Sequence, residues 1–144
     1  MKTVRDLLAG KSTDVWSIAP DKTVYDAIHL MAERGIGAVL VMEGRTLVGI
    51  LSERDYARQV ILKGKASKDT SVRDIMTSQV IRVTPEQTID ECMTIMTNSR
   101  IRHLPVMNED QLVGILSIGD VVKAVISEKQ MHIEQLEDYI KTSG

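Results

Sequence analysis

The chain has 144 residues, 43% of them hydrophobic, which is enough to build a buried core without help from metals or disulfides. Its 18 basic and 20 acidic residues give a formal net charge of −2 and are spread along the sequence, so we expect no nucleic-acid partner. Cys92 is the single cysteine and no Cys/His cluster has ligand spacing, which predicts no metal site and a reducing, cytoplasmic setting.

The sequence also argues against a membrane partner. No apolar run approaches the roughly 18 to 20 residues that span a bilayer. At the N-terminus the acidic residue Asp6 comes before any long apolar run, so we expect no secretory signal.

An internal repeat organises the chain. The segment LVGILS at 47–52 recurs letter for letter at 112–117, and the same offset relates Pro20 to Pro85 and Asp55 to Asp120. VRDLL at 4–8 resembles VRDIM at 72–76 at a slightly larger offset, so the first copy has extra residues in the polar loop 9–14.

Each copy predicts the same order of elements. After a short apolar strand and a proline, Thr23-x-x-Asp26 and Thr88-x-x-Glu91 resemble capping boxes that begin amphipathic helices. Two apolar runs then form a hairpin, at 38–41 and 47–51 in the first copy and at 103–106 and 112–116 in the second. A second helix follows, from about Asp55 to Gly64 and from about Asp120 onward.

These elements predict an α+β protein made of two tandem β-α-β-β-α domains, at residues 1–64 and 65–127, joined by a polar linker at 63–69. The last helix continues through a C-terminal extension at 128–144. Its apolar residues Ile133, Leu136 and Ile140 share one face, which can dock on its own module or on a partner's helix.

The order of these motifs resembles the cystathionine β-synthase (CBS) domain, present twice between Val4 and about Val125. Because almost nothing is left over, the chain looks like a stand-alone CBS-domain pair. The resemblance implies a pseudo-twofold module whose clefts hold AMP, ADP, ATP or NAD, with S-adenosylmethionine less favoured. It also implies a homodimer that passes ligand occupancy to an unidentified regulated protein.

In this family a Ser/Thr-x-x-Asp motif at the start of the last helix contacts the nucleotide, the carboxylate at the ribose and the hydroxyl facing phosphate. The matching positions are Ser117 with Asp120, and Ser52 with Asp55. The chemistry suits the ligand, because one carboxylate accepts from two adjacent ribose hydroxyls and a helix N-terminus favours phosphate. Capping is the alternative role of such a pair, and the two roles are compatible.

The resemblance implies two unequal sites. The main site would join basic and capping residues of one copy to a wall from the other: Lys11, Thr13, Val15, Ile36, Gly37, Arg102, His103, Ser117 and Asp120. The second site, which we expect to be the weaker, would comprise Ser52, Arg54, Asp55, Val80 and Ile81. Arg102 has no charged counterpart in the first copy, where Gly37 takes its place, and surface ion pairing is its alternative role.

Catalysis is not expected, since the sequence has no P-loop, no G-x-G-x-x-G, no H-E-x-x-H and no nucleophile elbow. The sequence therefore predicts a regulatory adenine-nucleotide-binding module without activity of its own. A protein-interaction scaffold with vacant clefts is the alternative.

Overall fold

The computed structural model describes residues 2–11 and 15–143, with side chains as far as Lys141, and it divides into two compact units. Unit 1 consists of residues 1–13, 82–108 and 113–144, and unit 2 of residues 14–81 and 109–112. The units are therefore not simply the two halves of the sequence. Each copy's body is completed by the short helical segment that precedes the other copy.

Unit 2 contains a three-stranded sheet with helices packed on it. In chain order it has β1 (Ser17–Ile18), α2 (Val24–Arg34), β2 (Ala38–Glu43), β3 (Thr46–Ser52), α3 (Glu53–Tyr56), the π-helical turn η1 (Ala57–Ile61) and α4 (Val72–Ile75). β1 runs parallel to β2, and β2 runs antiparallel to β3. The core joins α2, the sheet, η1 and α4 through Val24, Met31, Val39, Leu51, Val60 and Val72.

Unit 1 repeats this arrangement with a shorter sheet. It contains α1 (Val4–Ala9), α5 (Ile89–Ser99), β4 (His103–Asn108), all but the first two residues of its paired strand β5 (Gln111–Ser117), and α6 (Ile118–Ser143). The first predicted strand of the second copy is reduced to one parallel bridge, between Val83 and Val106. α1 enters the core through the fully buried Val4, which packs with side chains such as Cys92, Leu104 and Leu116.

The glycine of the repeated LVGILS segment has a packing role. A Cβ atom at Gly49 would lie 2.5 Å from Sδ of Met76, and one at Gly114 would lie 2.7 Å from Cδ2 of Leu8. Met76 directly follows α4 and Leu8 belongs to α1, so each glycine leaves room for the same part of the short helical segment in its unit. The segments 4–8 and 72–76, which we call the VRD segments, therefore pack on the sheets in the same way, each against a strand glycine.

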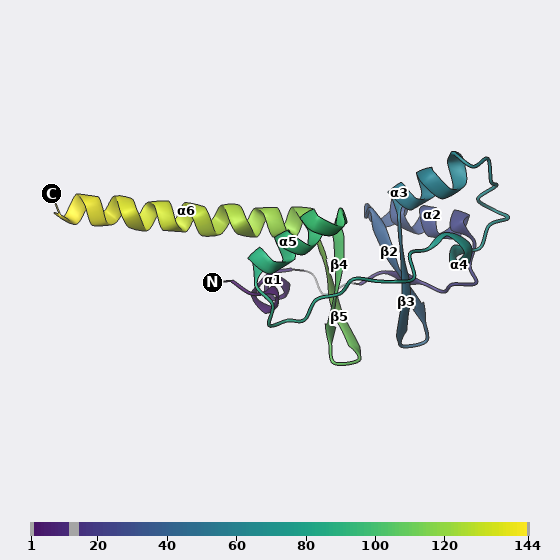
Figure 1. Ribbon diagram of the computed structural model, residues 1–144, viewed down its shortest axis with the longest axis horizontal. Coiled ribbons are helices and arrows are strands. Elements are labelled where there is room, and N and C mark those ends of the chain that lie inside the picture. The colour runs from purple at the N-terminus through teal and green to yellow at the C-terminus, as the bar shows by residue number, and fades with distance from the viewer. Residues whose placement is uncertain (1, 12–14, 144) are drawn as a thin grey trace. The chain divides into compact units, whose positions relative to one another are not determined.

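The predicted α+β class, the tandem copies and the C-terminal helix are confirmed. α6 is one continuous helix of 26 residues, and Figure 1 shows it continuing well beyond α5 of the same unit. The second helix of the first copy begins at Glu53, two residues before the predicted Asp55, and its last turn is π-helical. In the described part of the chain, none of the helices combines the length and the apolar character needed to cross a bilayer.

Candidate functional site

The Ser-x-x-Asp motif of unit 2 forms the start of α3. The Ser52 amide donates to Oδ2 of Asp55 over 2.9 Å, and the Asp55 amide donates to Oγ of Ser52 over 3.1 Å, which is a reciprocal capping box. The Glu53 amide donates to the carbonyl oxygen of Gly37 over 3.0 Å. This hydrogen bond holds Gly37, the residue just before β2, beside the start of α3.

Unit 1 has the same construction at the start of α6. The Ser117 amide donates to Oδ2 of Asp120 over 2.8 Å, and the Asp120 amide donates to Oγ of Ser117 over 3.2 Å. The Ile118 amide donates to the carbonyl oxygen of Arg102 over 2.8 Å, as Glu53 does to Gly37. Both motifs are therefore caps, and each capping carboxylate remains partly exposed.

Lys11 distinguishes the two helix starts. Its ammonium group donates to Oδ2 of Asp120 over 2.5 Å and to the carbonyl oxygen of Ile115 over 2.9 Å. The corresponding carbonyl in unit 2 belongs to Ile50 and accepts from the backbone amide of Thr77. At equivalent strand positions, the carbonyl group therefore accepts from the Lys11 side chain in unit 1 and from a backbone amide in unit 2.

The environment of Asp120 favours its ionised form. Burial raises the pKa of this carboxyl group, but the Lys11 hydrogen bond, the Ser117 amide and the Lys11 charge together bring the pKa below its ordinary value of 3.8. The two side chains of the pair are 30% and 28% exposed, so the pair is half-buried and still within reach of a ligand. It presents an ionised acceptor and a cation side by side.

The other predicted site residues fall into both units. Arg102 and His103 lie in unit 1 with Lys11, Ser117 and Asp120. The predicted wall residues Val15, Ile36 and Gly37 belong to unit 2, as do all the predicted members of the second site: Ser52, Arg54, Asp55, Val80 and Ile81. Thr13 lies outside the described residues. The complete sites remain predictions.

Two features of this region were not predicted. Arg100 ends α5 in the left-handed conformation, with φ of 55°, at the position where α2 ends on Gly35 with φ of 65°. The guanidinium group of Arg34 stacks on the Trp16 ring at 4.0 Å from its centroid. The repeat aligns Arg100 with Gly35, and this alignment could have indicated the left-handed helix end. The contact between Arg34 and Trp16 has no signal in the sequence.

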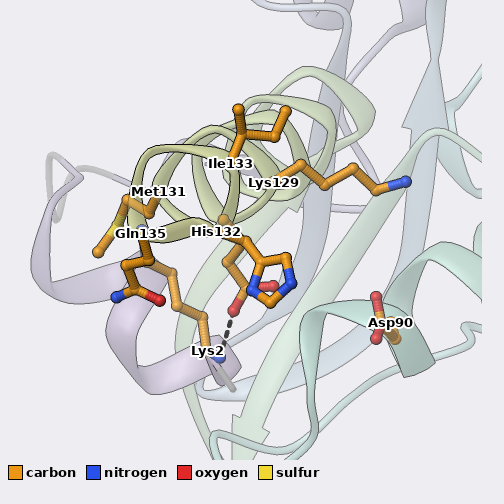
Figure 2. A pocket seen from close by; sticks show the side chains of 8 residues that line it. Lys2, Asp90, Lys129, Met131, His132, Ile133 and Gln135 are labelled. Atoms are coloured by element: carbon orange, nitrogen blue, oxygen red, sulfur yellow. Dashed lines mark hydrogen bonds between the residues drawn. The ribbon is translucent and has the colours of Figure 1, made fainter. Parts of the chain in front are cut away.

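A groove of about 760 Å³ lies elsewhere on unit 1 and contains none of the predicted site residues. Figure 2 shows it beneath α6, with Lys2 on one side and His132 and Lys129 above. The Lys2 amide donates to Oε1 of Glu128 over 2.6 Å, and both residues line the groove. Among the described residues, no three His, Cys, Asp or Glu side chains gather closely enough to hold a metal ion.

Comparison with known proteins establishes the class. A model of the CBS domain matches residues 4–61 and 72–127, so the chain belongs to the CBS-domain family and carries two such domains in tandem. Its sequence is 42% identical over 149 residues to the mitochondrial CBS domain-containing protein CBSX3 of Arabidopsis thaliana, covering 96% of this chain and 72% of that protein.

Solved structures agree with this family membership. A CBS-domain protein from Burkholderia ambifaria shares 49% sequence identity and superposes with a TM-score of 0.85, covering 88% of this chain and 95% of that one. The CBS domain pair of protein MJ0100, solved with 5′-methylthioadenosine and S-adenosyl-L-methionine, superposes with a TM-score of 0.79 over 89% of this chain and 98% of that one. At 21% sequence identity, this likeness shows a shared fold and no more.

Proposed function

We propose that this protein is a regulatory module that binds an adenine nucleotide and has no catalytic activity of its own. The observation that carries the proposal is the capped Ser-Asp pair, built alike at Ser52/Asp55 and Ser117/Asp120 after the shared segment LVGILS. Capping alone does not call for serine, because the reciprocal box at the start of α1 is made by Thr3 with Asp6, and threonine also caps the helix starts at Thr23 and Thr88. Family membership and the adenosine ligands of the MJ0100 pair support this reading.

The unit 1 pair is the proposed main site. A ribose diol would bind the ionised Asp120 carboxylate, and the phosphates would meet the cations next to it. Lys11 already lies against this carboxylate, so a nucleotide would either share Asp120 with it or draw the ammonium group toward its phosphates. AMP, ADP, ATP and NAD all offer both groups, and S-adenosylmethionine offers only the ribose.

Calorimetry with these five ligands tests the proposal. We expect at least one to bind, and Asp120→Asn to weaken it by about 10- to 100-fold because a charge-assisted hydrogen bond is lost. Asn keeps an oxygen that can cap α6, which limits the effect on folding. Lys11→Met should weaken the binding of ATP more than the binding of adenosine, which has no phosphate.

A matched control is available in the same chain. Asp26 occupies the first turn of α2, where its amide donates to Thr23, and Asp26→Asn makes the same chemical change outside the proposed sites. It should leave affinity unchanged. If none of the five ligands binds, the proposed function is wrong and the scaffold with vacant clefts takes its place.

The remaining parts of the proposal concern context. We propose that the module is a homodimer and passes nucleotide occupancy to a regulated protein, whose identity the chemistry does not specify. A cytoplasmic location stays a prediction, and the Arabidopsis relative carries a mitochondrial designation in its name.

A further inference from the structure

α6 carries a row of apolar side chains that unit 1 does not cover. Val121 and Ala124 of this helix face the core of the unit. A different face carries Val122, Ile126, Ile133, Leu136 and Ile140, whose side chains are between 39% and 67% exposed. With Lys129 these residues follow one another at alternating spacings of four and three, and we call them the α6 seam: Val122, Ile126, Lys129, Ile133, Leu136 and Ile140.

The C-terminal half of α6 needs a partner for this seam. Every residue from 131 to 140 is exposed, so the described part of the chain buries none of this stretch. A helical segment of this length is marginal in water when nothing packs on it. Alternating spacings of four and three are those of a two-stranded coiled coil, in which a second helix covers the row. The seam therefore fits one long helix with a matching row.

We propose that the seam pairs with the α6 seam of a second copy of this chain, and that the two helices run antiparallel. In this register Val122 faces the partner's Ile140, Ile126 faces the partner's Leu136, and Lys129 faces the partner's Ile133. Each layer then contains at least one large apolar residue, and the Lys129 stem covers its neighbour while its ammonium group reaches water.

Charge decides the orientation. Lys123 and Glu137 flank the seam on the same side, and the antiparallel register places each beside the other residue of the partner helix. A parallel pair would instead place Lys129 against the partner's Lys129 inside the seam, where two like charges repel. The antiparallel arrangement thus gains two opposite-charge contacts and avoids one repulsive layer.

A spin-label distance measurement tests the orientation. The label is attached to Lys141→Cys in a Cys92→Ala background, so that only one cysteine reacts. In the antiparallel pair the two labels lie ten residues from the centre on opposite sides, which gives about 30 Å at 1.5 Å per residue. A distance below about 20 Å would indicate a parallel pair, and the absence of a defined distance would indicate an unpaired helix, and either result overturns the proposal.

Charge exchange tests the register, with the dissociation constant measured by analytical ultracentrifugation. Lys123→Glu and Glu137→Lys should each weaken the dimer several-fold, and the double variant should restore it. Glu134→Lys makes the same change on the outward face of α6 and should have no effect. Ile133→Glu should abolish the 30 Å distance. If the distance survives Ile133→Glu, or the double variant does not recover, the seam is not the interface.

Discussion

The glycine of LVGILS offers a sharp test of how the short helical segments are bound to the two sheets. Alanine at position 49 would place Cβ 2.5 Å from Sδ of Met76 and 3.0 Å from the carbonyl oxygen of Thr77. That carbonyl cannot retreat freely, because it accepts a hydrogen bond from the Ile50 amide over 3.0 Å. At Gly114 the three nearest atoms all belong to the Leu8 side chain, which can rotate.

The structure therefore predicts unequal costs for the same substitution. Overpacking of this kind costs about 1–3 kcal/mol, and alanine recovers about 0.4–1 kcal/mol by restricting the unfolded chain. Gly49→Ala should lower the free energy of unfolding by about 1–2 kcal/mol, because backbone has to move. Gly114→Ala should change it by less than about 1 kcal/mol, because only a flexible side chain has to move.

Urea unfolding followed by circular dichroism measures both free energies. A double-mutant cycle adds Met76→Ala to Gly49→Ala, and the combined loss should fall short of the sum of the single losses by about 0.5 kcal/mol or more, since the clash is relieved. The reasoning is refuted if Gly49→Ala is as stable as the wild type, or if Gly114→Ala is the more damaging substitution.

A strained residue, an ion pair and a buried thiol give three further expected outcomes. Arg100→Gly should raise the free energy of unfolding in urea by about 0.5–1 kcal/mol by removing a side chain from the left-handed conformation, whereas Gly35→Ala should lower it by a similar amount. The pKa of Asp120 lies below its unfolded value of 3.8, so its contribution to stability is present above that pH and is lost as the pH falls through the folded pKa. Lys11→Met should flatten this acid-side fall in melting temperature. Burial, with a smaller contribution from the neighbouring Glu91 charge, raises the pKa of the Cys92 thiol, which should react with a thiol reagent far more slowly in the native protein than in urea.

Local physical chemistry made much of the fold predictable from the sequence. Threonine or serine followed three residues later by an acid predicts a helix start, and the starts at Thr23, Ser52 and Thr88 each have the expected amide-to-hydroxyl hydrogen bond. Short apolar runs predicted both hairpins, and the shared face of Ile133, Leu136 and Ile140 fitted a last helix that continues. Each of these signals lies within a few neighbouring residues, where the chain determines its own structure.

Features that depend on contacts between distant residues were not predictable in this way. The pairing of Lys11 with Asp120 joins positions more than a hundred residues apart, and a loop lysine looks the same in sequence whether it is paired or solvated. The sequence also does not show that segment 4–8 packs in the unit of the second copy and segment 72–76 in that of the first, because a repeat gives only the order of its segments. The π-helical turn at Ala57–Ile61 has no sequence signal that we recognise.

One difference between the copies concerns charge near the two helix starts. The capping residues Ser52 and Ser117 and the glycines Gly49 and Gly114 are the same in both copies, whereas the residues at the ends of α2 and α5 and before β2 and β4 change from Gly35 and Gly37 to Arg100 and Arg102. Arg100 adopts a left-handed conformation that glycine takes without strain, which is a cost to stability. If both copies served only as a scaffold, glycine would be the more stable choice at position 100. The proposed function gives these added cations a role, since an anionic ligand would favour unit 1 over unit 2, and it predicts a measured stoichiometry of one nucleotide per chain.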